Sequence, residues 1–456
     1  MRTSGKQWAR ALRQPALWLA TLLALCIAQT AMARQWTLAD CLRYAMENNI
    51  TLRKSTLQQE SAEETHIQSR RQLLPSLQAS TSHSGNYTPW VESGISGDGY
   101  SRASVDKGSY NGTYSLMGSY TIFDGNKSRN QAKLNQLAVE EAEINTELQA
   151  KTIEEQIAQL YVQILYSQEA VTVNKEILQT SITNEKRGEE MVRVGKMSKA
   201  DLAQLASQRA QDEYNVVSAE TNVMDFKRQM RQLLQLTDDE PFDVAVPETT
   251  DSMATAAVPQ LEAVYTAALG QRPEMRLYRN RIDQSEMSIK IAKAEWMPTI
   301  SANAQLSTST TSMNTSGWGS QMKNNFSAGG GLTISMPIYD RRQARTNVNK
   351  AQIQRQEAML DLEETQTKLH STIENYWLQA TTNQSKFKAA QASVMSSQAS
   401  YDLLTEQFRL GLKNISELNI GKDTLLQAKQ NMLQSKYLSI LNLDMLKFYQ
   451  DGTIRQ

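Results

Sequence analysis

The chain has 456 residues, and its 48 basic and 48 acidic side chains give a formal net charge of zero at pH 7. A neutral chain lacks the positive charge with which nucleic-acid-binding proteins hold phosphates, so we expect no nucleic acid among its partners. Its two cysteines are Cys26 and Cys41.

The segment 1–33 has the pattern of an export signal. A basic start is followed by the apolar stretch 16–28 and by the small-residue site Ala31-Met32-Ala33, which predicts cleavage that leaves Arg34 first. A lipoprotein signal at Cys26 is disfavoured, because Leu25 stands where a small residue is required. After cleavage only Cys41 remains, so no intramolecular disulfide can form.

The rest of the chain consists of two copies of one pattern. Shifted by 223 positions, residues 38–77 align without a gap, and Leu74-Pro75-Ser76-Leu77 falls on Met297-Pro298-Thr299-Ile300. Shifted by 216, residues 121–234 align likewise, and the difference, 223 − 216 = 7, places a seven-residue excess between residues 77 and 121. We expect two structural repeats, 34–257 and 258–456, each larger than the units of about 20 to 50 residues that build solenoids.

Long helices dominate both expected repeats. Residues 124–193 and 340–408 are almost free of Pro and Gly, and their apolar residues recur about every three to four positions. About 65 helical residues would extend roughly 100 Å, and such lengths are typical of coiled coils. Return helices are expected at 199–235 and 415–449, and shorter helices are expected before each long one, at 38–48, 53–73, 261–270 and 274–296.

Between the helices the period changes to two, which predicts one β-hairpin in each repeat. The strands are expected at 77–84 and 110–122, and at 300–307 and 325–336, around the Gly/Ser/Asn/Thr-rich loops 85–108 and 308–324. Alternation fits either a sheet on a soluble core or a membrane barrel. The barrel is favoured because the polar positions are small and uncharged, and we expect lipid contact for the apolar positions, including Tyr110, Tyr114, Tyr120 and Phe326.

No segment after the export signal approaches the roughly 18 apolar residues of a membrane-spanning helix, so membrane insertion would require a β-barrel. Four strands cannot close a barrel, because about eight is the minimum. The chain is therefore expected to form an oligomer.

In the order of its elements the chain resembles the TolC-like outer-membrane efflux channel family over residues 36–450. The matching features are the Pro-containing entries into the hairpins, the junctions Phe123-Asp124-Gly125 and Tyr339-Asp340-Arg341, and two helical-hairpin turns. The resemblance implies a mainly α fold with a β-barrel part: a homotrimer with a twelve-stranded transmembrane barrel, continued by a long periplasmic α-helical barrel. It also implies a passive exit duct that docks a periplasmic adaptor and an inner-membrane pump, which supplies the energy.

The resemblance identifies the two turns, 193–202 and 409–418, as tips that dock the adaptor. Gly195 and Gly411 allow the left-handed backbone that ends a helix, and Ser198 and Asn414 suit the N-cap of the next helix. The expected docking residues are Arg193, Val194, Gly195, Ser198, Asp201, Arg409, Leu410, Gly411, Asn414 and Glu417.

The resemblance also implies a periplasmic gate at the second turn. Phe408 stands at the family's aromatic position, Lys413 at its cation position and Glu417 at its first acidic position, while Ile420 replaces the second acid. Three Glu417 carboxylates would favour cations. The alternative is that Glu417 is only a helix-capping residue.

No catalytic, metal or cofactor site is expected. His66, His83 and His370 fall on three different elements, without further ligands at metal-binding spacing, and Gly329-Gly330-Gly331 lacks the lysine and helix of a phosphate loop. The alternative function is a structural or adhesive coiled-coil protein of the cell envelope, which would not need the hairpins. The sequence does not indicate the cargo.

Overall fold

The computed structural model describes residues 35–90, 94–95, 102–103, 107–237, 242–247 and 251–454. The expected export signal, including Cys26 and the cleavage site before Arg34, lies outside the described residues. None of the helices within these ranges is long and apolar enough to cross a membrane.

Two helices of 67 residues each are the longest elements, α5 (Lys127–Arg193) and α11 (Gln343–Arg409). The return helices are α6 (Lys199–Leu234) and α12 (Ile415–Asp451). The shorter helices expected before the long ones are α3 (Leu38–Asn48), α4 (Ile50–Arg71), α8 (Leu261–Gln271) and α9 (Pro273–Ala294). A single turn of helix, α7 (Asp251–Ala254), was not expected.

The chain divides into two compact units, and each draws on both sequence repeats. The first comprises residues 1–53, 149–272 and 368–456, and the second comprises residues 54–148 and 273–367. The helical-hairpin turns belong to the first unit, and the β-sheet belongs to the second. Packing therefore does not separate one repeat from the other.

The main sheet has four antiparallel strands in the order β2 (Ser76–Tyr87), β5 (Gly108–Phe123), β7 (Thr299–Thr311) and β8 (Ser327–Ser335). Leu116 pairs with both Ala79 and Leu306, and Leu306 pairs with Ala328. Because side chains alternate between the faces of a sheet, this register gathers the apolar positions of all four strands on one face, including Tyr110, Tyr114 and Tyr120.

The opposite face of these four strands is polar and contains no charged residue. Its residues are mainly Ser, Thr, Asn and Gln, such as Ser80, which pairs with Ser115, and Ser307, which pairs with Ser327. The hydroxyls of Ser80 and Ser115 are 2.7 Å apart and hydrogen-bonded.

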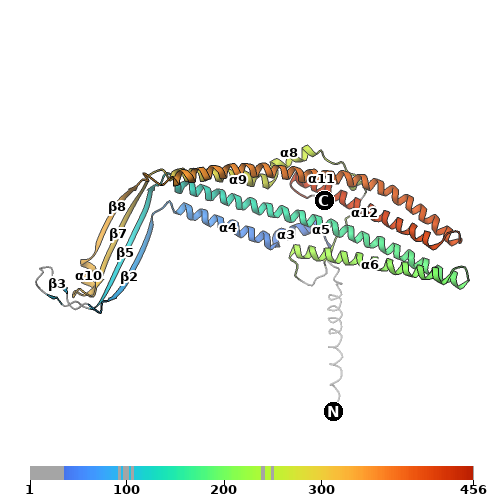
Figure 1. Cartoon of the computed structure of the whole chain (residues 1–456), viewed down its shortest axis with the longest axis horizontal. Helices are drawn as coiled ribbons and strands as arrows, with labels where there is room; N and C mark the ends of the chain where they lie inside the picture. Colours follow the sequence, from blue (N-terminus) through green and yellow to red (C-terminus); the bar gives the residue numbers. More distant parts are fainter. Residues whose placement is uncertain are drawn as a thin grey trace, which may run out of the picture. The chain divides into compact units, whose positions relative to one another are not determined.

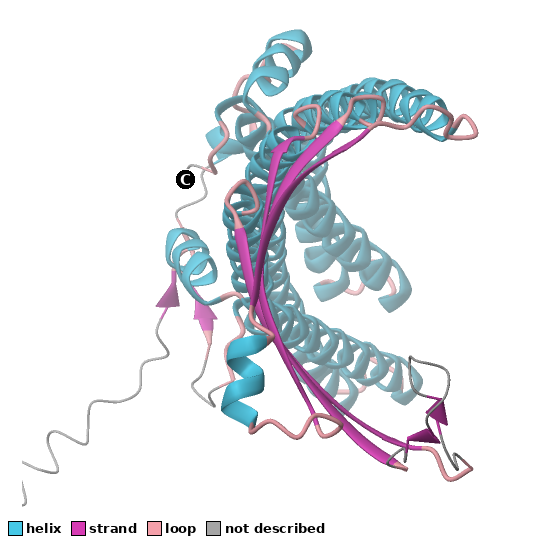
Figure 2. Cartoon of the chain, turned by 90° about the vertical axis from the view of Figure 1, so that its left-hand side faces the viewer, coloured by secondary structure: helices cyan, strands magenta, loops and turns pink. Residues whose placement is uncertain are grey.

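The two hairpin loops differ in structure. The loop between β2 and β5 contains two short paired strands, β3 (Gly94–Ile95) and β4 (Arg102–Ala103). The loop between β7 and β8 contains a helix, α10 (Trp318–Asn324), where the sequence analysis expected only a loop. Figure 2 shows the strands bowed, with α10 against their convex side. The ring of Trp318 contacts Tyr114 edge-on, at 6.2 Å between centroids, so the convex face is the apolar one.

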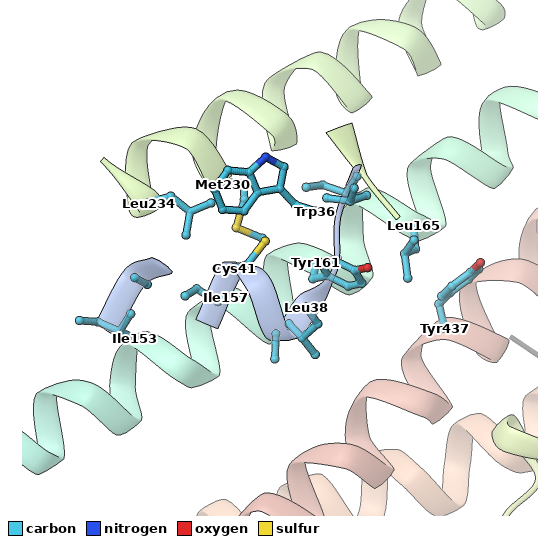
Figure 3. Close-up of a cluster of buried hydrophobic side chains, with 14 of the residues drawn as sticks. Trp36, Leu38, Cys41, Ile153, Ile157, Tyr161, Leu165, Met230, Leu234 and Tyr437 are labelled. Carbon is cyan, nitrogen blue, oxygen red and sulfur yellow. The ribbon is translucent and has the colours of Figure 1, made fainter. Parts of the chain in front are cut away.

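An apolar core of the first unit forms where α3 packs on α5 and α6 (Figure 3). Cys41, Ile157, Tyr161 and Met230 are almost fully buried in it. Two short parallel strands, β1 (Gln35–Trp36) and β6 (Asp243–Val244), add Trp36 and Val244 to this core. Burial raises the pKa of the Cys41 thiol to about 12.

The junctions between strands and long helices repeat in structure although their sequences differ. Gly125 and Asn126 are both left-handed, with φ of 68° and 66°, and Arg341 and Arg342 follow the same path with φ of 53° and 69°. In the first junction a side chain at position 125 would have its Cβ 2.7 Å from the Cβ of Met297, so glycine is required for space as well as for conformation.

Candidate functional site

Both helical-hairpin turns, which Figure 1 shows between α5 and α6 and between α11 and α12, have the same backbone conformation. Gly195 and Gly411 are left-handed, with φ of 74° and 76°. In each turn a backbone hydrogen bond closes the end of the long helix. It runs from the Lys196 N–H to the Met191 carbonyl (2.8 Å) in the first turn and from the Leu412 N–H to the Gln407 carbonyl (2.8 Å) in the second. This is the glycine-terminated helix end that the sequence predicts.

The return helices begin with side-chain caps. The Ser198 hydroxyl accepts a hydrogen bond from the Asp201 N–H at 3.0 Å, and the Asn414 side chain accepts one from the Glu417 N–H at 2.9 Å. Only the second turn has the reciprocal bond, in which Glu417 accepts from the Asn414 N–H at 3.3 Å. Glu417 is therefore a capping residue of α12.

The arginines and aliphatic residues of the two helical-hairpin turns are exposed. Arg193 pairs with Glu190, and Arg409 pairs with Glu406 at 2.9 Å. The apolar side chains of Val194 and Leu410 are 60% and 65% exposed. Each turn thus presents an unburied aliphatic side chain next to an arginine.

Glu417 also forms an ion pair. Lys413 Nζ lies 2.5 Å from Glu417 Oε1 within the same chain. The hydrogen bond from Lys413, together with the one from the Asn414 N–H, holds the pKa of Glu417 below its usual value. The two expected gate residues are therefore in direct contact.

The other two expected gate residues lie in different environments. Phe408 is buried in a cluster with Leu205, Tyr401, Ile415, Leu418 and Leu425. Ile420 is 64% exposed. The cluster that contains Phe408 joins the two hairpins, since Leu205 belongs to α6, whereas Ile420 is exposed on α12.

A buried ion pair links the two hairpins and was missed in the sequence analysis. Lys422 of α12 and Asp212 of α6 are in direct contact, and each side chain is 2% exposed. Ser181 of α5 donates to Asp212 Oδ2 at 2.5 Å, and Lys422 Nζ donates to the Ser181 hydroxyl at 3.0 Å. Three helices therefore share one buried, hydrogen-bonded charge pair.

The sequence contains a signal for the burial of Lys422, although not for its pairing with Asp212. Lys422 lies four residues after Leu418 and three before Leu425, both buried, so it occupies an apolar position of the helix. When the two repeats are aligned, Ala206 is the equivalent of Lys422, and Ala428 is the equivalent of Asp212. Each charged residue of the pair thus has an alanine as its equivalent in the other repeat.

The three histidines lie apart. His66 contacts the Ala132 carbonyl (3.1 Å), His83 contacts the Tyr110 hydroxyl (2.5 Å), and His370 lies 3.8 Å from Glu374. Within the ranges that the structure describes, no group of three or more His, Cys, Asp and Glu side chains could hold a metal ion.

The chain matches the family model described as outer membrane efflux protein over residues 41–235 and 264–446. It is 22% identical over 428 residues to the outer membrane protein TolC of Escherichia coli (strain K12), covering 91% of this chain and 82% of TolC. It is 23% identical over 279 residues to the toxin and drug export protein A of Aggregatibacter actinomycetemcomitans, covering 61% of this chain and 59% of that protein.

Solved structures show the same fold. The structure of CusC matches with a TM-score of 0.77 at 15% identity and covers 91% of both chains. The outer membrane channel CmeC of Campylobacter jejuni matches with a TM-score of 0.75 at 18% identity, covering 91% of this chain and 86% of CmeC. A structural or adhesive coiled-coil protein is not favoured. The chain belongs to the outer membrane efflux protein family, and it is an efflux channel of the outer membrane that extends into the periplasm.

Proposed function

We propose that three copies of this chain form a passive exit duct, in which their strands close into one twelve-stranded barrel and their long helices continue as a tube. The observation that carries this is the four-stranded sheet, whose outer strands β2 and β8 have no partner on one edge among the described residues. Unpaired edges of 12 and 9 residues would leave backbone groups unsatisfied in lipid. Pairing β2 of one copy with β8 of the next satisfies them.

The test is a disulfide between copies. In a Cys41→Val background, a cysteine at Ser80 in β2 is combined in turn with one at Gly329, Gly331 or Thr333 in β8, all on the uncharged face. One of these registers should produce dimers and trimers on a non-reducing gel. A cysteine at Ser115, in the inner strand β5, replaces Ser80 as the control. Conducting preparations that contain only monomers would overturn the proposal.

The two turns are proposed to dock a periplasmic adaptor, which connects the duct to an inner-membrane pump that supplies energy. The support is their matched backbone, together with Val194 and Leu410, exposed beside Arg193 and Arg409. Val194→Glu and Leu410→Glu should abolish crosslinking of the tips to the adaptor in cells while leaving bilayer conductance unchanged. Undiminished crosslinking would exclude these side chains from the docking surface.

The gate is proposed at the second turn, with Lys413 and Glu417 facing the axis, Ile420 as an apolar constriction and Phe408 holding the hairpin closed. The Lys413–Glu417 pair supports this, because it neutralises carboxylates that would repel one another around a threefold axis. Lys413→Glu should raise single-channel conductance, and Glu417→Ala should weaken cation selectivity. Unchanged selectivity in Glu417→Ala would leave Glu417 as a helix cap alone.

A further inference from the structure

A shallow groove of about 400 Å³ lies on the apolar face of the sheet, next to α10. The apolar-face side chains that line it include Ala79, Leu116, Leu306 and Phe326. Its lining contains no charged residue. A groove of this chemistry suits a hydrocarbon chain rather than an ion or a polar ligand.

Hydrogen bonds fix α10 to the sheet, and the helix forms a ledge beside the groove, where it contacts the lining residues Tyr114 and Thr308. Gln321, which is 5% exposed, accepts from the Thr311 N–H at 2.7 Å and donates to the carbonyls of Asn314 (3.2 Å) and Ser316 (2.7 Å). The Thr308 hydroxyl donates to the Met322 carbonyl at 2.7 Å. These bonds hold α10 beside the groove, whose lining residues lie on the strands, apart from Phe326.

The composition of α10 matches a membrane interface. Trp318 is 59% exposed although its ring contacts Tyr114, and the exposed Lys323 is the one charged residue of the helix. Tryptophan is enriched where hydrocarbon meets the headgroups, and lysine extends its charge toward water. The polar positions Thr308 and His83 lie on the strands at the level of α10, whereas Leu116 and Leu306 lie further from the loops. The ledge thus lies at the loop end of the band of aliphatic side chains.

We infer that the groove binds one acyl chain of an outer-membrane lipid, and that α10 fixes the depth at which this lipid sits. The inference rests on the proposed duct, because the convex, apolar side of the sheet must face lipid (Figure 2). The lipid chain covers Leu116, Leu306 and Phe326, which are 37%, 43% and 59% exposed in the chain alone.

The test is lipid retention. Oligomers purified in detergent are incubated with palmitoyl-oleoyl phosphatidylcholine, washed at limiting detergent and examined by native mass spectrometry. We expect one retained lipid per chain. Ala79→Phe fills the groove and should lower retention at least tenfold, whereas Leu332→Ala, on the same face but outside the groove lining, should leave it unchanged.

Gln321→Ala provides a second variant that does not alter the apolar lining. Loss of its three hydrogen bonds should free the ledge and lower retention, so the inference remains testable if Ala79→Phe does not assemble. Equal retention by the wild type and Ala79→Phe, or no retention by the wild type, would overturn the inference. Bilayer conductance of the same preparations reports the duct separately: normal conductance without lipid retention rejects the groove alone, and absent conductance rejects the duct.

Discussion

The hairpin of α5 and α6 and the hairpin of α11 and α12 both pack a glycine of one helix against a leucine of the other, but the glycine lies on opposite helices. Gly188 of α5 lies against Leu205 of α6, and an added Cβ would be 2.5 Å from a Leu205 methyl. At the equivalent positions of the other hairpin, the long helix has Leu404 and the return helix has Gly421, again 2.5 Å from the leucine methyl. The long helix therefore has the glycine in the first hairpin and the leucine in the second. Close packing of the pair is therefore the shared requirement, and either helix can provide the glycine.

The buried ion pair is the contrasting case, because it has no counterpart in the other repeat. Lys422 and Asp212 connect one hairpin to the other, whereas Ala206 and Ala428 occupy the equivalent positions. The glycine–leucine contact within each hairpin is thus repeated, whereas this ion pair between the hairpins occurs once. Such a charge pair specifies which helix faces lie together, although apolar residues of similar volume could pack as tightly.

The largest effect on stability is expected from breaking the Lys422–Asp212 pair. Lys422→Ala leaves Asp212 buried without its cation and should lower the free energy of unfolding by about 3–5 kcal/mol. Lys422→Met combined with Asp212→Leu should recover most of this loss. Urea titrations of the purified protein measure both, and equal destabilisation by the single and double variants would show that the charges themselves are needed.

A smaller loss of stability is expected from placing a side chain at Gly188. Gly188→Leu places a second leucine against Leu205 and should cost about 1–3 kcal/mol through overpacking. Adding Leu205→Gly copies the arrangement of Leu404 and Gly421 and should restore stability. The control is Leu205→Gly alone, which opens a cavity. Failure of the exchange to rescue would mean that the two hairpins are not interchangeable in packing.

The caps of the two turns should differ chiefly in their pH dependence. Ser198→Ala and Asn414→Ala should each cost about 1 kcal/mol of local stability, measured by hydrogen exchange of the return helix. The contribution of Glu417 is fully present above the ordinary pKa of a glutamate, because its folded pKa is lowered, and it is lost as the pH falls through that lowered pKa. Protection of the first turn of α12 from hydrogen exchange should therefore fall in acid. It should not fall in the Glu417→Gln variant, and Glu417 should cause no such fall at the start of α6.

Little change in stability is expected from replacing Cys41. Its equivalent in the second repeat is Val264, and both side chains are fully buried. Cys41→Val should therefore change stability by less than about 1.5 kcal/mol. With the thiol pKa at about 12, iodoacetamide should not modify Cys41 at about pH 8 until the protein unfolds, which mass spectrometry of the alkylated peptide would show.

Local patterns made the elements and the turns predictable. Alternation in residues 110–122 indicates the strand, and Gly195 and Gly411 mark the turns, because each signal depends on residues close in sequence. The helix α10 was missed since its stability comes from Gln321 and Thr308, which bind the backbone of other segments. Lys422 and Asp212 are 210 residues apart, and no periodicity indicates that they meet.

The uncharged face of the sheet has a consequence for what the duct can select. If this face lines the barrel, a solute passing Ser80, Thr113 or Ser307 meets hydroxyl and amide dipoles that can reorient toward either sign of charge. Fixed charges are what give a wide pore its preference among ions. Drugs, metal complexes and peptides would then cross this segment with similar barriers. Discrimination would then have to occur before the cargo enters the barrel, at the proposed docking partner or at the proposed ring of Glu417, and the barrel itself would not select among solutes.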